Sequence, residues 1–170
     1  MNENKNNLNN NILITGGAGY IGSCLALYLK KKYRITILDK KKSKNLINTC
    51  NLLDLKKLNH ILNKYKPKLI IHLAAQSLVD ETINKKKYYQ NNILATKNLI
   101  TTMKKHNLTN LIFSSTAAVY KYSGKILNEN NTIEPKSTYA KTKLRCEKII
   151  KDSKINSIIL RFFNVCSSLK

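Results

Sequence analysis

The sequence predicts an α/β protein built on a parallel sheet, and three observations support this fold class. Short apolar runs alternate with amphipathic stretches long enough for helices, which is the pattern of β-α-β units. The chain has 170 residues, 42% of them apolar, enough for one domain with a buried core. Four of its glycines cluster between the first apolar run and the first amphipathic stretch, where such folds have a tight turn.

The expected strands and helices follow from the spacing of apolar residues. Strands are expected at Ile12–Thr15, Arg34–Leu38, Lys68–His72, Asn110–Ser115 and Ser157–Arg161. Helices are expected at Tyr20–Lys31, Leu55–Tyr65, Tyr88–His106 and Ser137–Lys151. Residues 1–10 are predicted to be a disordered Asn-rich tail, and residues 11–170 to form a single domain.

The chain is strongly basic, with 31 Lys and Arg against 9 Asp and Glu and a net charge of +22. Such a charge raises the hypothesis of nucleic-acid binding. The lysines are scattered, however, and are not interleaved with aromatic residues as in a single-strand binding groove. Abundant Asn and Ile and scarce Arg indicate a general composition bias. We therefore expect no specific nucleic-acid partner, only salt-sensitive attraction to polyanions.

The sequence contains no signal for a membrane or an export pathway. No apolar run approaches the roughly 20 residues that cross a bilayer, and the first eleven residues lack the apolar segment of a secretory signal. We expect no membrane partner and a cytoplasmic location. The cysteines form no CxxC pair, so neither a metal site nor a disulfide framework is expected: Cys24, Cys50, Cys146 and Cys166.

The glycine cluster Gly16–Gly22 lies between an expected strand and an expected helix. Glycines allow the backbone to approach a pyrophosphate, and the helix N-terminus offers N–H groups to it. Asp39 follows the second strand, 20 residues after Gly19, where a carboxylate can hold the ribose hydroxyls of an adenosine and repel a 2′-phosphate. The sequence thus predicts a Rossmann-like, doubly wound domain that binds NAD rather than NADP, a preference that Lys40–Lys42 weaken slightly.

Tyr139 and Lys143 are four residues apart, which puts a phenol and an ammonium group on one face of a helix. A Tyr pKa near ~10 is too high for a base at neutral pH, but a nearby cation favours the tyrosinate, which can take a proton from a sugar hydroxyl. Thr116 follows the preceding strand, at the sheet edge where ligands bind, and can hydrogen-bond the same hydroxyl.

Six segments of the chain resemble the extended short-chain dehydrogenase/reductases, and most closely the UDP-glucose 4-epimerases. They follow the family's order and spacing: Thr15–Ser23, Ile71–Ala75, Tyr88–Thr96, Phe113–Tyr120, Tyr139–Lys143 and Leu160–Val165. A 4,6-dehydratase of this family would carry Asp-Glu directly after Thr116, where this chain has Ala117 and Ala118. The resemblance implies an NAD-dependent isomerase that interconverts UDP-glucose and UDP-galactose through a 4-keto intermediate.

The resemblance also implies a role for each matching position. Tyr139 would be the base at the sugar's 4-hydroxyl, Thr116 would share its hydrogen-bond path, and Lys143 would bind the nicotinamide ribose and lower the Tyr pKa. With Thr116 and Tyr139, Asn164 would contact the UDP-sugar. The positions implied to line NAD are Gly16, Gly19, Tyr20, Ile21, Gly22, Asp39, Asn51, Leu52, Leu73, Ala74, Asn91, Tyr139, Lys143 and Phe163. Asn92 is the neighbouring candidate for a structural asparagine.

The chain departs from the family pattern in several ways, of which two bear most on function. Asn51 stands where the family usually has an acidic residue for the adenine, so it must supply a neutral hydrogen bond. The C-terminal substrate domain of the family is expected to be missing after Lys170. Two function hypotheses therefore stay open: a truncated epimerase, alone or with a separate C-terminal half, and an inactive NAD-binding remnant. The family also implies a homodimer through the helices at Tyr88–His106 and Ser137–Lys151.

Overall fold

The computed structural model describes residues 11–41, 48–77, 84–122, 124 and 126–166, and these form a six-stranded sheet in which all paired strands are parallel. The strands are β1 (Asn11–Thr15), β2 (Arg34–Asp39), β3 (Asn48–Thr49), β4 (Leu69–His72), β5 (Asn110–Thr116) and β6 (Asn156–Phe162). Their order is β3-β2-β1-β4-β5-β6, so the sheet grows outward in both directions from β1. This is the Rossmann-like, doubly wound order that the sequence predicted. The predicted tail, residues 1–10, lies outside the described residues.

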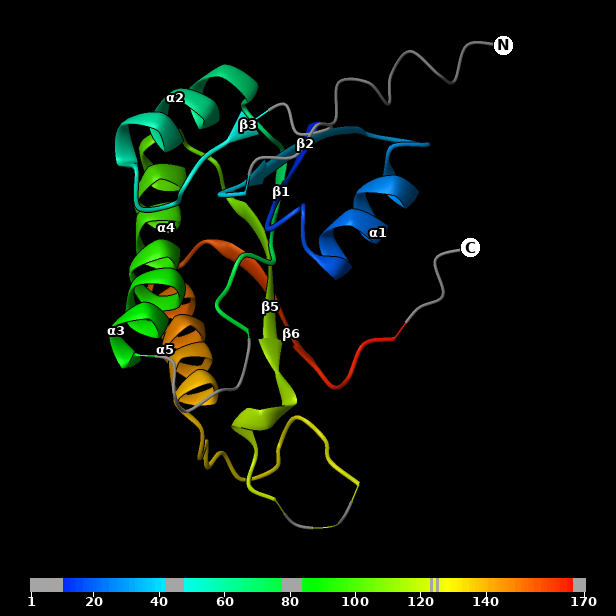
Figure 1. Cartoon of the computed structure of the whole chain (residues 1–170), viewed down its shortest axis with the longest axis vertical. Coiled ribbons are helices and arrows are strands. Elements are labelled where there is room, and N and C mark those ends of the chain that lie inside the picture. Colours follow the sequence, from blue (N-terminus) through cyan, green and yellow to red (C-terminus); the bar gives the residue numbers. More distant parts are fainter. Residues whose placement is uncertain (1–10, 42–47, 78–83, 123, 125, 167–170) are drawn as a thin grey trace.

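The helices pack against both faces of this sheet. They are α1 (Tyr20–Leu29), α2 (Leu55–Tyr65), α3 (Lys85–Tyr88), α4 (Ala95–Lys105) and α5 (Thr138–Asp152). In Figure 1, α2, α4 and α5 lie together on one side of the sheet and α1 lies on the other. None of the described helices is long and apolar enough to cross a membrane.

The side chains of β1 alternate between the two faces of the sheet and belong to two separate hydrophobic clusters. Leu13 belongs to the larger cluster with Leu99 of α4 and Ile150 of α5, whereas Ile14 belongs to the smaller cluster with Ala26 of α1. Successive side chains of a strand point to opposite faces, so a buried parallel strand needs apolar residues at every position. This explains the uninterrupted apolar run that marked the first strand in the sequence.

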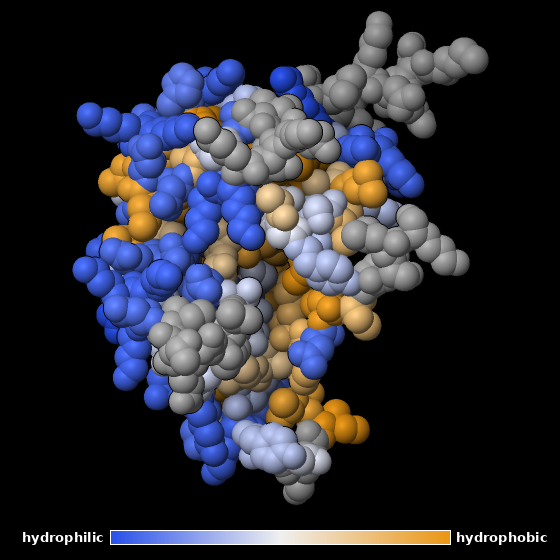
Figure 2. All heavy atoms as spheres, in the orientation of Figure 1, coloured by the Kyte–Doolittle hydropathy of each residue, from blue (hydrophilic) through white to orange (hydrophobic). Residues whose placement is uncertain are grey.

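The β6 edge leaves part of the sheet uncovered by the described residues. Helix α1 packs over β1, β2 and β4, while Ile158 and Leu160 of β6 remain 56% and 38% exposed. Figure 2 shows mostly hydrophilic residues, with a few hydrophobic ones among them, over the helical side of the molecule, and hydrophobic residues on the side of the sheet away from α4.

Most predicted elements are confirmed, with small shifts at their ends. The first helix ends at Leu29 rather than Lys31, and the last strand spans Asn156–Phe162. The short strand β3 was not predicted as such. The long helix predicted at Tyr88–His106 begins earlier, at Lys85, and is not uniformly α-helical.

A π-helical segment, Tyr89–Leu94, interrupts that helix and separates the roles of two adjacent asparagines. Asn92 is buried: its Nδ2 donates to Thr142 Oγ1 at 2.9 Å, and its Oδ1 accepts the Gln76 N–H at 2.7 Å. Asn91 instead lines the cleft described below. The wide turn thus allows one residue to anchor α5 while its neighbour faces a ligand site, as is frequent for π-helical turns at functional sites.

His72, at the end of β4, connects the start of the glycine turn to α4. Its Nδ1 lies 2.7 Å from Thr15 Oγ1, and its Nε2 lies 3.0 Å from Thr96 Oγ1. The Thr15 hydroxyl also accepts the Ala74 N–H at 3.3 Å. Burial, together with the charge of Lys143, lowers the pKa of His72 to about 3. The imidazole is therefore neutral in the folded chain at neutral pH.

Acidification is expected to destabilise the fold through His72. As the pH falls below the ordinary pKa of 6.5, His72 binds a proton in the unfolded chain. In the folded chain His72 stays neutral until the pH approaches its lowered pKa of about 3, so the stability of the fold decreases through this pH range. We expect a loss of about 2 kcal/mol between pH 7 and pH 5 from this group. Urea unfolding at both pH values measures it. His72→Gln should show a smaller pH dependence, and His60→Gln, at an exposed histidine, should match the parent chain; equal dependence in all three chains would contradict the assignment.

Candidate nucleotide-binding and catalytic cleft

A cleft with a volume of about 690 Å³ opens at the carboxyl ends of the strands. Every site residue predicted from the sequence lines it: Gly16, Gly19, Tyr20, Ile21, Gly22, Asp39, Asn51, Leu52, Leu73, Ala74, Asn91, Thr116, Tyr139, Lys143, Phe163 and Asn164. These residues follow β1, β2, β3, β4, β5 and β6 or lie on α1, α5 and the π-helical segment. The topology therefore gathers segments from the whole chain where open parallel sheets bind ligands.

The glycine turn provides a cradle that side chains would fill. Gly16 has a φ of +71°, and a Cβ placed on it would lie 2.7 Å from the backbone nitrogen of Ala74. A Cβ on Gly22 would collide with the carbonyl oxygen of Gly16, so α1 could not pack against the turn. Gly19, at the N-terminal end of α1, has no side chain to cap the first turn. A helix start without this side-chain cap fits the pyrophosphate of a dinucleotide, which binds N–H groups at a helix N-terminus.

Asp39 is held in the cleft by two backbone groups. Its Oδ2 accepts the Ala18 N–H and its Oδ1 accepts the Lys41 N–H, each at 3.0 Å. The carboxylate is thus fixed between the glycine turn and the segment after β2. Lys40 and Lys41 line the cleft beside it, so positive charge partly offsets the carboxylate. The arrangement favours a free 2′-hydroxyl on the ribose, although less strongly than an isolated Asp would.

The segment after β3 forms a neutral wall of the cleft. Asn51 accepts the Leu53 N–H on its Oδ1 at 3.0 Å, which fixes the orientation of its amide. Leu52 is buried next to it. Burial raises the pKa of the Cys50 thiol to about 11, with Asp54 adding to the effect, so this group is neutral as well. An adenine placed here would meet an amide and apolar groups.

Helix α5 begins at the cleft and carries Tyr139 and Lys143 in its first turns. Ser137 caps it, with its Oγ accepting the Ala140 N–H at 3.1 Å. Lys143 is 2% exposed, and its Nζ lies 4.2 Å from the centre of the Phe113 ring. Burial lowers the pKa of Lys143 to about 8, against the opposing influence of Cys146 and Glu147. Lys143, which lines the cleft, therefore loses its proton at a lower pH than an ordinary lysine.

The Tyr139 environment differs from what the resemblance implied. Burial raises the pKa of its phenol, and the nearby Cys146 adds to the effect, whereas the implied effect of Lys143 was to lower it. The physical reason is that the phenol has lost water while the Lys143 ammonium lies over the Phe113 ring. Tyr139 is therefore protonated in the cofactor-free chain, and a further positive charge in the cleft is needed to favour the tyrosinate.

The ends of β5 and β6 complete the catalytic side of the cleft. Thr116 is buried, and its Oγ1 accepts the Ala118 N–H at 3.2 Å in the short turn Ala117–Val119. Phe163 and Asn164 follow β6 and are exposed. Ala118, in the turn after β5, also lines the cleft.

Several lining residues were not singled out from the sequence as site residues. They include Ala18, Leu38, Cys50, Ala75, Ser77, Ala95, Ser114, Ser115, Ala118, Phe162 and Val165. Most lie within three positions of a strand's carboxyl end, and that position is the signal that could have identified them. Their small or apolar side chains carry no chemistry that a motif would show.

The parallel sheet order, the glycine cradle and the fixed Asp39 define the class of this protein as a Rossmann-type dinucleotide-binding protein. Comparison with sequence families is more specific. The chain belongs to the NAD dependent epimerase/dehydratase family, whose profile matches residues 12–169. NAD is thus its cofactor, as the sequence predicted, and the cradle of the glycine turn fits it.

Relatives and solved structures agree with this assignment. The chain is 32% identical to a UDP-glucose 4-epimerase of Rhizobium meliloti, with 94% of this chain and 53% of that protein covered. It is 35% identical to a dTDP-D-glucose 4,6-dehydratase of Dictyostelium discoideum, with 91% and 43% covered. The structure matches UDP-glucose 4-epimerase from Brucella ovis in complex with NAD with a TM-score of 0.84 and 30% identity, over 91% of this chain and 52% of that one. The chain therefore spans about half the length of the relatives it matches.

Proposed function

We propose that this chain is the NAD-binding part of a nucleotide-sugar 4-epimerase that interconverts UDP-glucose and UDP-galactose. The observation that carries the proposal is the presence, in one cleft, of the glycine cradle, Tyr139 with Lys143 on α5, and Thr116 at the end of β5. UDP-glucose 4-epimerases among the relatives and solved structures support the choice of reaction.

Four residues of the chain have separate roles in the proposed reaction. When bound, NAD supplies reversible acceptance of a hydride from C4 of the sugar, which makes a 4-keto sugar and allows the hydride to return to the other face. Tyr139 accepts the proton of the 4-hydroxyl and later gives it back, so the net reaction is an isomerisation. Thr116 hydrogen-bonds the same hydroxyl, Lys143 binds the nicotinamide ribose as a cation, and Asn164 contacts the UDP-sugar.

Epimerisation is favoured over dehydration by the turn after β5. A sugar dehydratase must remove a hydroxyl group as water, which needs a proton donor in addition to the Tyr base. Ala117 and Ala118 occupy the positions where the dehydratase branch carries Asp-Glu, and Ala118 lines the cleft.

The match to about half of each relative supports a second candidate function, NAD binding without turnover by this chain alone. In that case the chain is an inactive remnant or needs a separate C-terminal partner to hold the UDP-sugar. A homodimer through α4 and α5, and a cytoplasmic location, remain predictions from the family resemblance.

The proposed function is tested by purifying the chain, measuring its NAD content and assaying conversion of UDP-galactose to UDP-glucose. Bound NAD with conversion supports the epimerase. Bound NAD without conversion supports the second candidate. A chain that binds no NAD contradicts both.

A further inference from the structure

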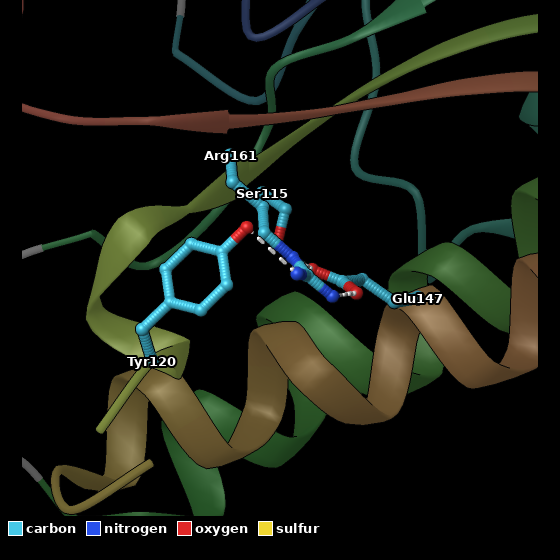
Figure 3. A network of polar contacts seen from close by, with 4 residues as sticks. All are labelled: Ser115, Tyr120, Glu147 and Arg161. Atoms are coloured by element: carbon cyan, nitrogen blue, oxygen red, sulfur yellow. Dashed lines mark hydrogen bonds and ion pairs between the residues drawn. The ribbon is translucent and has the colours of Figure 1, made fainter. Parts of the chain in front are cut away.

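A cluster of four side chains joins α5 to the ends of β5 and β6 (Figure 3). Arg161 Nε and Nη2 donate to the two carboxylate oxygens of Glu147 at 3.0 and 2.7 Å, and its Nη1 donates to Tyr120 Oη at 2.9 Å. Ser115 Oγ also donates to Glu147 Oε1. Glu147 is 2% exposed. Burial raises the pKa of Glu147, but the hydrogen bonds from Arg161 and Ser115 outweigh burial and lower it overall, so the carboxylate is ionised.

Three members of this cluster are close in sequence to residues of the cleft. Glu147 follows Lys143 by four positions on α5, which is one helical turn. Ser115 directly precedes Thr116 on β5. Arg161 lies near the end of β6, three residues before Asn164. Any shift of Glu147 would therefore move Lys143, Thr116 and Asn164 relative to one another.

Stability alone does not account for a buried ion pair. Removing two charges from water costs as much as their attraction returns, and a well-packed apolar pair often stabilises a core equally well. The bidentate geometry of Arg161 on Glu147 specifies orientation instead, because a planar guanidinium and a carboxylate fit in one arrangement. The ring of Tyr120, 4.8 Å from Arg161 Cζ, holds the guanidinium in that arrangement.

We propose that Glu147 is a positioning residue of the cleft, which anchors α5 to the ends of β5 and β6 and places a carboxylate charge one helical turn from Lys143. The inference rests on the proposed function, in which Lys143 binds the nicotinamide ribose as a cation. Burial lowers the pKa of Lys143 to about 8, and the charge of Glu147 acts against burial, so it raises the protonated fraction of the lysine at neutral pH.

The charges around Lys143 come from several elements. On α5 itself are Tyr139, Cys146 and Glu147, of which Cys146 and Glu147 raise the pKa of the lysine. His72 on β4 is neutral, because burial lowers its pKa to about 3. Arg161 on β6 acts through its pairing with Glu147. Glu147 is thus the one group among these that is fully ionised and negative at neutral pH.

The test is the titration of Lys143 in the cofactor-free chain, followed by carbon-13 NMR with labelled lysine and assigned with Lys143→Met. The parent chain should titrate near pH 8. Glu147→Gln should lower this midpoint by about one pH unit, because the attracting charge is lost. Arg161→Gln should raise it, because Glu147 then lacks its compensating cation. If the pair of Glu147 and Arg161 had a purely structural role, the two substitutions would not shift the Lys143 midpoint in opposite directions.

Glu134→Gln is the matched control, since it removes a carboxylate paired with Lys121 at an exposed site. Its Lys143 midpoint should equal that of the parent chain. The proposal is overturned if Glu147→Gln titrates like this control, if both test variants shift in one direction, or if both are unfolded by circular dichroism, which would assign the cluster to folding alone.

NAD affinity at pH 7.5, measured on the same variants, separates this inference from the proposed function. Glu147→Gln should weaken NAD binding about threefold to tenfold, in proportion to the lost cation. A shifted midpoint with unchanged NAD affinity keeps the positioning role and removes the contact between Lys143 and the ribose. An unshifted midpoint in a chain that still converts UDP-galactose removes the positioning role and keeps the proposed function.

Discussion

Tyr139→Phe should lower the conversion of UDP-galactose by about 10²–10⁴-fold, the range typical for loss of a positioned general base, while NAD stays bound. The change removes one hydroxyl group and keeps the ring, so the walls of the cleft are retained. A chain that converts the sugar with Phe at this position would contradict the assignment of Tyr139 as the base. Tyr122→Phe is the matched control, because the same hydroxyl is removed from a side chain that is 87% exposed.

A second measurement does not depend on turnover. Burial raises the pKa of Tyr139 in the cofactor-free chain, so its phenol holds its proton at neutral and moderately alkaline pH. The positive charge of the nicotinamide ring favours the tyrosinate, so addition of NAD should lower that pKa and release a proton. Ultraviolet difference absorbance of tyrosinate measures this, and the signal should be absent from Tyr139→Phe. An identical signal in both chains would assign the change to another tyrosine.

Gly16→Ala should destabilise the chain by about 2–5 kcal/mol and weaken NAD binding at least about tenfold. Two costs combine at this position. The φ of +71° is unfavourable for any residue with a side chain, and the added Cβ would lie 2.7 Å from Ala74 N and 2.8 Å from Ala74 Cα. The turn would have to move away from the segment after β4, and both line the cleft.

Gly124→Ala separates these two costs. Gly124 has a φ of +64°, but nothing lies within 4 Å of a Cβ placed on it. The Gly124→Ala chain should therefore lose only the conformational part of its free energy of unfolding, about 1 kcal/mol, and keep its NAD affinity. Urea unfolding and NAD titration of both variants measure the difference. Equal losses in the two variants would show that crowding against Ala74 contributes nothing.

The sequence predicted the sheet and most helices because buried parallel strands and amphipathic helices leave a periodic record. The strand β3 leaves no such record: it has two residues and pairs with β2 through Leu38 with Asn48 and Asp39 with Thr49. The π-helical segment is equally hidden, since its wide turn is maintained by the contacts of Asn92 with Gln76 and Thr142. These partners are distant in sequence, so no local pattern signals them.

The candidate site could be predicted where its chemistry depends on residue type and spacing, as for Asp39, Tyr139 and Lys143. Electrostatic behaviour could not be predicted in this way. The direction of the Tyr139 pKa shift depends on burial, which only the packed structure shows. Glu147 resembles a solvated residue on a Lys-rich helix until the fold brings Arg161 of β6 against it.

The glycine turn also stands apart in the composition of the chain. Lys, Asn and Ile are abundant throughout the sequence, and it has only 5 glycines in 170 residues. Four of them, Gly16, Gly17, Gly19 and Gly22, are in this turn, and at three of these positions even a methyl group would overlap backbone or a packed side chain. At these three positions any other residue would force the turn or its neighbours to shift. The shape of the turn therefore depends on the absence of side chains.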